Sequence, residues 1–471
     1  MNEKYAKPYF ESFMVALSLS LLPIKIFSYV VPFIALFWFI VRSSSGRVLQ
    51  RTLMAITGIV VLLGFYYIIY QYQGTYFLLG NSVVAIFTYS TFFLLLVIPG
   101  RGISSAFSYE KYAPVLKWVI LIEGIIGILQ FVIVTVTGIT YIINGDSVQG
   151  TIGIDAILNG NAGFGNQIFV ISMIFFIFLF IPYVLQQRKY YYVVLVGLLS
   201  IMLAGVLHVF VSLVWALLFT ILFYRKNLIF SDLSKIIGGV AMALLMLLPL
   251  EFFFPGISKT TAVFFQIYQD RDSPKFEAMD NAFDKLPEQY PLVSLIGLGP
   301  GQYSSRAGLI SSGNYYGSKM NFLPNEVSEP FRKLFQHTWL EYTHGSDRYG
   351  NSTMHRPFFS ILSLFAEFGF VGLGLFLGCI LYFFMKIRLL FVFFKERKNK
   401  VNTYLAFAMG VLLIMLVFIS TFENYLETVQ ALLPGMMLFK VLYSQLLTEA
   451  KQKPQEELVQ KELVQEELVS V

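Results

Sequence analysis

The chain has 471 residues, of which 56% are hydrophobic, 17% aromatic and only 13% charged, and its mean hydropathy is +0.68. These values lie far outside the range of soluble globular domains. The formal net charge is +6, and we do not expect nucleic acid as a partner. The composition predicts a polytopic integral membrane protein.

The fold class expected is all-α. Apolar runs of about 16 to 22 residues recur along the chain and are long enough to cross the hydrocarbon core of a bilayer as helices. The alternating polar pattern that a membrane barrel needs is absent. The single cysteine, Cys379, excludes an intramolecular disulfide, and we expect no cleavable signal peptide.

In chain order, the apolar runs predict about twelve spans: about nine in an N-terminal bundle, 1–254, and about three in 358–446. The run 190–224 is too long for one crossing and is expected to cross twice, with a break near Gly205. The first two runs are expected to form a helical hairpin. Apart from 190–224, the predicted runs, of which the first two form this hairpin, are 10–22, 27–41, 53–70, 78–98, 115–136, 167–185, 236–254, 370–385, 404–421 and 429–446.

Basic residues are concentrated on every second connection between the predicted spans. The loops at 71–77, 137–166 and 422–428 contain none, whereas the connections on the other side of the membrane are basic. Cytoplasmic loops carry the basic excess. We therefore expect both termini in the cytoplasm, the long 255–357 loop outside, and His208 near the outer membrane surface.

The polar segment 255–357 is too long to be a mere connector. It holds three of the four histidines and about ten basic against about ten acidic residues, which argues against a simple membrane-binding basic patch. Histidine suits general-base chemistry, and arginine binds diphosphate oxygens in pairs. The histidine spacing gives no zinc signature, and Asp270 with Asp272 is only a weak Mg²⁺ signal, so we predict a site without metal or cofactor.

Placing a polar side chain inside a membrane-spanning run costs free energy, so such residues are functional candidates by default. Four stand out: Glu123, Gln130, His208 and Glu367. For Glu123 and Glu367 a structural role, in helix packing or at a helix end, is as good an interpretation as a functional one. Two glycine-rich pieces, 160–166 and 297–303, are predicted to be turns.

The C-terminal tail, 447–471, repeats a Gln-Glu/Lys-Glu-Leu-Val unit three times. A five-residue period matches no helical repeat and gives no continuous apolar stripe. We expect a frayed or disordered cytoplasmic tail without a catalytic role.

Three pieces of the sequence carry a resemblance to a known family. The first is the Gly/Asn-rich segment 160–166 before an apolar run. The second is Arg271, a helical stretch through Phe283, and the turn 297–301. The third and most specific is His355 followed by Ala-Glu-Phe-Gly-Phe-Val-Gly at 366–372 and an apolar helix. In this order they resemble the bacterial O-antigen polymerase and O-antigen ligase superfamily of GT-C type membrane glycosyltransferases.

The resemblance implies transfer of a glycan from a polyprenyl diphosphate carrier to a hydroxyl group, without a metal. His355 would then be the base that deprotonates the acceptor. Because the interval from His355 to Glu367 is about one helical turn longer than in the family, His344 or His337 is the second choice. The residues expected to hold the diphosphate are Arg271, Arg306, Arg356 and His208.

These expectations favour an oligosaccharide repeat-unit polymerase in surface polysaccharide (O-antigen or capsule) biosynthesis, in the bacterial inner membrane. The expected partners are the lipid-linked oligosaccharide, membrane lipid and a chain-length regulator. An O-antigen ligase with a lipid or protein acceptor uses the same chemistry and stays open. A lipid-linked oligosaccharide flippase is the rival from another class, against which stands the lack of an evident inverted repeat.

Overall fold

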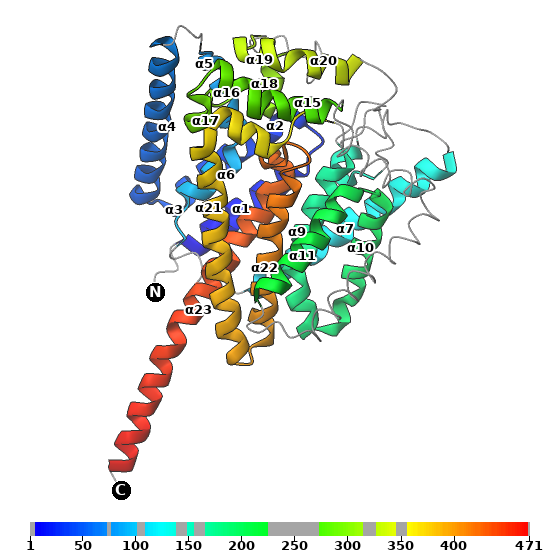
Figure 1. The fold of residues 1–471 in the computed structure, drawn as a ribbon. Helices are drawn as coiled ribbons and strands as arrows, with labels where there is room; N and C mark the ends of the chain where they lie inside the picture. Colours follow the sequence, from blue (N-terminus) through cyan, green and yellow to red (C-terminus); the bar gives the residue numbers. More distant parts are fainter. Residues whose placement is uncertain are drawn as a thin grey trace.

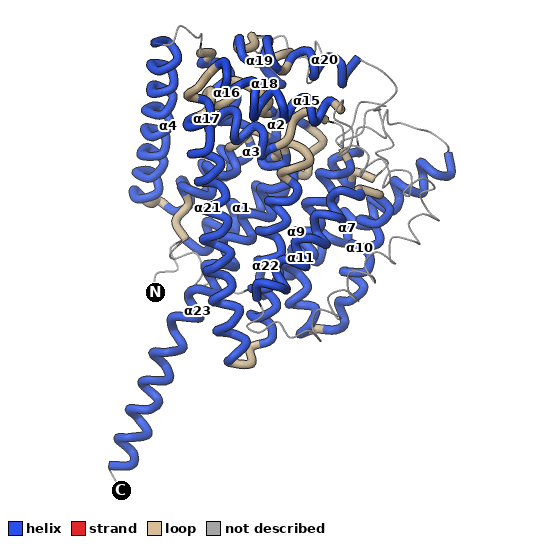
Figure 2. The backbone as a smooth tube through the Cα atoms, viewed as in Figure 1, coloured by secondary structure: helices blue, strands red, loops and turns tan. Residues whose placement is uncertain are grey.

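The computed structural model describes residues 5–72, 77–100, 109–137, 148–154, 165–224, 273–313, 326–344 and 356–469, and the side chains at 25–26, 343–344 and 452–469 are not among the described atoms. Every regular element within these ranges is helical (Figure 2). The predicted all-α class is confirmed for the part of the chain that is described.

Seven described helices are long and apolar enough to cross a membrane, or eight if one bent pair is a single span. The membrane character predicted from the composition is confirmed. The described residues thus account for seven or eight of about twelve predicted spans, and the run at 236–254 lies outside them. The seven are α4 (Gly46–Tyr72), α7 (Tyr109–Thr137), α9 (Asn166–Gln186), α11 (Leu207–Tyr224), α21 (Ser360–Glu396), α22 (Lys400–Ile419) and α23 (Val429–Val469).

Three of these helices form the centre of the bundle. In α9, α22 and the apolar part of α23, 72% of the most apolar window is buried, against 11% to 33% in the other four. A helix that is apolar on all sides and buried packs against protein on all sides, whereas the others keep a broad apolar face for lipid. The central helices therefore fix the positions of the connections at their ends.

The long run 190–224 is divided at the residue that the sequence predicts. Helix α10 (Tyr191–Ala204) ends at Gly205, whose φ of +64° is left-handed, and α11 begins at Leu207. A left-handed residue after the last helical turn is the usual way to stop a helix, and glycine adopts it without a steric penalty. The break places His208 in the first turn of α11.

The N-terminal hairpin is also confirmed. Helices α1 (Ala6–Ser20) and α3 (Val31–Ser43) pack side by side, joined through the short α2 (Lys25–Ser28). The Ser12 hydroxyl donates to the Ala35 carbonyl at 2.7 Å. At 15 and 13 residues, both helices are shorter than the seven candidate spans.

The predicted span 78–98 is not a single straight helix. The run forms α5 (Leu79–Thr88) and α6 (Ser90–Val97), which are bent by 65° at Tyr89. The start of α5 is bonded to a distant turn: Ser82 donates to the Pro300 carbonyl at 2.8 Å, and the Leu78 amide donates to Gln302 at 3.1 Å. These tertiary contacts set the direction of α5 against that of α6.

Above one end of the bundle lies a layer of short helices, which we call the cap layer (residues 273–313 and 326–344; Figure 1). It is the described part of the predicted 255–357 loop. The layer has an apolar core of its own, which includes Phe331, Phe335 and Trp339 together with Tyr66 and Tyr70 of α4. Its helical elements are α15 (Pro274–Asp280), a π-helix (Asn281–Lys285), α16 (Leu286–Gln289), α17 (Val293–Ile296), α18 (Arg306–Ser311), α19 (Glu329–Leu334) and α20 (Gln336–His344).

The C-terminal tail differs from the expectation of disorder. Helix α23 continues through the repeats to Val469, and its second half projects from the end of the bundle opposite the cap layer (Figure 1). Glutamate, glutamine, lysine and leucine are strong helix formers. Their backbone preference extends the helix even though the five-residue period gives no continuous apolar stripe.

Candidate functional site

A buried carboxylate, Glu423, lies where the cap layer meets the bundle. It belongs to the connection between α22 and α23 and is only 2% exposed. Its Oε1 accepts from Arg356 Nη1 at 2.7 Å and from Arg306 Nη2 at 3.3 Å. We call the group formed by His208, Lys275, Arg306, Arg356, Glu423 and Tyr425 the Glu423 cluster.

Two of the basic residues come from the first turns of short cap-layer helices. Ser273 caps α15, with Pro274 in its first turn, and Ser305 caps α18 by accepting from the Gly308 amide at 3.2 Å. Serine caps and a first-turn proline favour helix starts at these positions. The helices carry Lys275 and Arg306 into the cluster in their first turns.

Lys275 is almost fully buried, at 3% exposure. Its Nζ donates to the Phe422 carbonyl at 3.0 Å and lies 5.2 Å from the ring centre of Phe359 and 5.6 Å from that of Phe422. Burial lowers the pKa of Lys275 to about 7, although the nearby Glu423 carboxylate opposes the change. A small change in local charge therefore changes the protonation of this amine at neutral pH.

His208 contributes from the bundle side. Its Nε2 shares a 2.6 Å hydrogen bond with the Tyr425 hydroxyl, and the two rings are stacked at 5.9 Å. The donor in this bond depends on the histidine tautomer. The contact joins the start of α11 to the loop that carries Glu423.

The loop itself is fixed by neutral polar bonds. The Asn424 amide donates to the Ser304 carbonyl at 2.9 Å and accepts from the Ser363 hydroxyl at 3.1 Å. The Ser360 hydroxyl donates to the Glu423 carbonyl at 3.2 Å. The carboxylate is thus held between α18 and the start of α21 independently of its ion pairs.

The cluster carries more positive than negative charge. Burial raises the pKa of Glu423, but Arg356 and Arg306 outweigh this effect and hold it below its usual value, so the group is ionised. Glu427 does not add a second negative charge at neutral pH, because burial and the neighbouring Glu367 raise its pKa to about 8. One ionised carboxylate therefore faces two arginines and a titrating lysine, an arrangement that can accept an anion.

Three of the residues predicted to bind diphosphate come together here: Arg306, Arg356 and His208. Arg271 and His355 lie outside the described residues. His344 ends α20, and its side chain is outside them as well.

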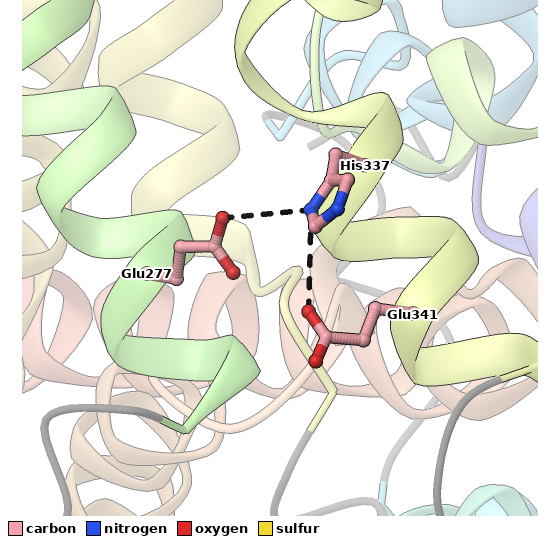
Figure 3. Close-up of side chains that lie close together, drawn as sticks. All are labelled: Glu277, His337 and Glu341. Atoms are coloured by element: carbon pink, nitrogen blue, oxygen red, sulfur yellow. Dashed lines mark ion pairs between the residues drawn. The ribbon is translucent and has the colours of Figure 1, made fainter.

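His337 is placed apart from the cluster, on the surface of α20 (Figure 3). Its side chain is 84% exposed, and Nδ1 lies 4.0 Å from a carboxylate oxygen of both Glu277 and Glu341. The ligand atoms of these three residues are within 4.8 Å of one another, which is close enough for a shared metal ion. The group is open to solvent, and none of its three side chains is buried. It is separate from the Glu423 cluster.

The Glu367 side chain binds the backbone of a turn. It is fully buried, and its carboxylate accepts from the backbone amides of Gly301 at 2.6 Å, Tyr303 at 3.0 Å and Ser305 at 3.2 Å. The predicted turn at 297–303 thus folds around this side chain. A backbone hydrogen bond joins the same two segments: the Gly299 amide donates to the Glu367 carbonyl at 2.8 Å.

The polar residues of α7 also hold backbone. Glu123 accepts from the Thr151 amide at 3.0 Å, and Gln130 accepts from the Gly150 amide at 2.8 Å while donating to the Gly150 carbonyl at 2.6 Å. Gly150 has a φ of +65°, so the segment is a tight turn. Both side chains satisfy the backbone groups of this turn.

Sequence reasoning missed Lys275, Glu423 and Tyr425. The available signal was the loop 422–428, which places two carboxylates, Glu423 and Glu427, between two strongly apolar runs without a basic residue. Acids in such a place need partners from elsewhere in the chain. The basic residues of the long loop were the obvious source.

Comparison with protein-family models, with curated proteins and with solved structures finds no match. The fold and the site define a polytopic helical membrane protein with a buried, net-positive cluster at one end of its bundle.

Proposed function

We propose that this protein is a membrane glycosyltransferase that uses a polyprenyl diphosphate-linked oligosaccharide as donor. The observation that carries the proposal is the Glu423 cluster, in which Arg306, Arg356 and Lys275 converge on a single carboxylate. The family resemblance of the sequence predicts a cationic site of this kind. The cluster lies at the level where the cap layer meets the membrane helices, which suits a lipid-linked substrate.

The reaction requires charge stabilisation at the leaving group. A bond forms between the acceptor oxygen and the anomeric carbon, while the bond from that carbon to the diphosphate oxygen breaks and its electron pair leaves with the diphosphate. The cations of the cluster would stabilise the charge on that oxygen. Lys275, with a pKa of about 7, would gain a proton as the anion binds.

The acceptor hydroxyl must lose its proton to a base. His355 remains the proposed base, and it precedes Arg356 directly in the chain. His344 and His337 stay as second choices, and the 84% exposure of the His337 side chain makes it the weakest of the three. No metal is required by the proposed mechanism.

The finer topology belongs to the same proposal: about twelve spans, both termini in the cytoplasm and the cap layer outside the bacterial inner membrane. Growth of an O-antigen or capsule chain by repeat units is our first assignment, with a chain-length regulator as a partner. Ligation of the glycan to another lipid or protein is the alternative.

The test is turnover by the purified protein in detergent with EDTA present. A polyprenyl diphosphate oligosaccharide is supplied as the only substrate, and lipid-linked products are separated by size. The polymerase assignment predicts a ladder of longer glycans with release of polyprenyl diphosphate. Transfer only after a lipid or protein acceptor is added would instead indicate a ligase.

The site is tested with matched arginine variants. Arg356→Ala and Arg306→Ala are each expected to lower turnover about 100-fold, the scale for loss of one preorganised charge-stabilising donor. Arg332→Ala, an exposed arginine of α19 in the same layer, is expected to retain full turnover.

The base is tested separately. His355→Ala should abolish polymer while the protein remains folded and abundant, and wild-type product lengths in this variant would remove His355 from the mechanism. If no product forms with any acceptor and vesicles containing the protein move the intact donor across the bilayer, the protein is a transporter.

A further inference from the structure

A second site lies on the membrane-spanning part of the protein. It is a groove of about 940 Å³ between α6, α21, α22 and α23, with Arg51 of α4 at its edge. Its walls are apolar and include Phe92, Phe376, Ile380 and Phe439. An apolar groove of this size accommodates hydrocarbon chains.

The groove carries basic groups within its apolar lining. Lys440 of α23 is partly buried there, and its Nζ donates to the carbonyls of Leu95 and Ile98 at the end of α6. Lys440 also lines the groove, so a bound head group can reach its amine. Arg51 interacts electrostatically with Lys440, so its guanidinium lies near this amine at the groove.

Helix α4 carries Arg51 away from the cap layer. Near one end of this helix, Tyr66 donates to the Ile296 carbonyl of the cap layer at 2.5 Å. Arg51 lies about 22 Å further along the helix axis, at 1.5 Å per residue. Arg51 is therefore separated from this cap-layer contact by about four helical turns.

We infer that this groove binds an anionic phospholipid, with the phosphate at Arg51 and Lys440 and the acyl chains along the apolar wall. Basic pockets between transmembrane helices are suited to anionic head groups in this way. A third basic residue, Lys451, lines the same groove about three turns after Lys440 and extends the positive edge. The site is separate from the proposed catalytic cluster and does not depend on the transfer reaction.

The experiment measures lipid binding to the full chain in detergent. Native mass spectrometry counts phosphatidylglycerol and, as a zwitterionic comparison, phosphatidylcholine retained by the purified protein. Arg51→Gln is expected to weaken phosphatidylglycerol binding about fivefold, the scale for one basic residue near a lipid head group. Arg47→Gln, an exposed arginine of the same helix that does not line the groove, is expected to bind as the wild type does.

The position of the lipid is read from Cys379, the single cysteine, which is exposed and lines the groove. Phosphatidylglycerol should slow alkylation of this thiol in the wild type and in Arg47→Gln, and less in Arg51→Gln. Equal retention of the two phospholipids, or equal protection of Cys379 in all three proteins, would overturn the inference. Displacement of phosphatidylglycerol by an equimolar polyprenyl phosphate would overturn the choice of a phospholipid as occupant.

Discussion

At the scale of single residues, the main feature is one carboxylate that faces several buried cations. Removing two charged groups from water costs several kcal/mol each, and their attraction offsets this only with good geometry. The short contact from Arg356 to Glu423, at 2.7 Å, supplies that geometry, whereas Arg306 is further away at 3.3 Å. The balance of the cluster therefore depends on Glu423.

Glu423→Gln should destabilise the protein, because it removes the charge that faces the buried Arg306 and the partly buried Arg356. Breaking a buried pair on one side costs about 3 to 5 kcal/mol. The measurement is the unfolding temperature in detergent. Inorganic diphosphate should raise that temperature in the wild type and raise it more in the variant, whose cluster is one charge more positive. Absence of any diphosphate effect on both proteins would count against an anion site.

Lys275 makes stability depend on pH. Its pKa is about 7 in the folded protein and near 10.5 when unfolded, so between these values the unfolded state binds more protons and stability rises with pH. Below about pH 7 the amine is protonated in both states. The loss of stability from burying the charged amine is then at its largest and no longer changes with pH. Lys275→Met should remove this slope between pH 7 and 10, as measured by unfolding temperature. A slope equal to that of the wild type would show that Lys275 is not the responsible group.

At the scale of elements, two glycines hold the cap layer on the bundle: Gly297 at the end of α17 and Gly369, a non-helical break inside α21. Gly297 and Gly369 both have positive φ, at +75° and +63°, and each lies against the other's segment. The Tyr66 hydroxyl donates to the Ile296 carbonyl, and Tyr70 bonds to the Gly297 carbonyl, so α4 supports the same turn. A side chain at either glycine would separate α17 from the start of α21.

Gly297→Ala is expected to lower the unfolding temperature strongly. A Cβ there would lie 2.1 Å from the Glu367 carbonyl carbon, and the left-handed backbone adds strain. Gly374→Ala is the matched control, because a Cβ at that position of α21 meets nothing within 4 Å. Alanine is the better helix former, so this variant should unfold at the wild-type temperature or above. Equal behaviour of the two variants would contradict the tight turn.

At the scale of the whole molecule, the proposed orientation can be tested with impermeant thiol reagents. In a Cys379→Ser background, a cysteine replacing the exposed Glu288 of the cap layer should be labelled in intact cells. A cysteine replacing Glu396, at the other end of α21, should be labelled only after the cells are permeabilised. The reverse pattern would invert the topology and move the Glu423 cluster to the cytoplasmic side.

The fold was predictable where one local rule decides the outcome. Gly205 between two apolar runs stops one helix and starts the next, and the structure confirms the break. The bend at Tyr89 was not predictable, because the run is apolar on both sides of it and the direction of α5 is set by distant contacts. Local hydropathy reports burial, but it does not report which remote turn a helix end will bind.

Only part of the candidate site was predictable from the sequence. Arg306, Arg356 and His208 were selected because their residue types suit an anionic ligand, and they do lie together. Glu423 and Lys275 were missed, because neither has a local pattern that points to a partner. The partnership between them and the arginines depends on packing of α15, α18 and the 422–428 loop.

The position of Glu423 in the sequence has a consequence for biosynthesis. During translation, His208, Lys275, Arg306 and Arg356 all leave the ribosome before the acid that balances them. Until the connection after α22 is inserted, the basic residues of the Glu423 cluster are without the carboxylate that they face in the folded protein. Arrival of the last hairpin would then complete the cluster, so a chain shortened before residue 423 should expose its basic residues to proteolysis rather than assemble a partial site.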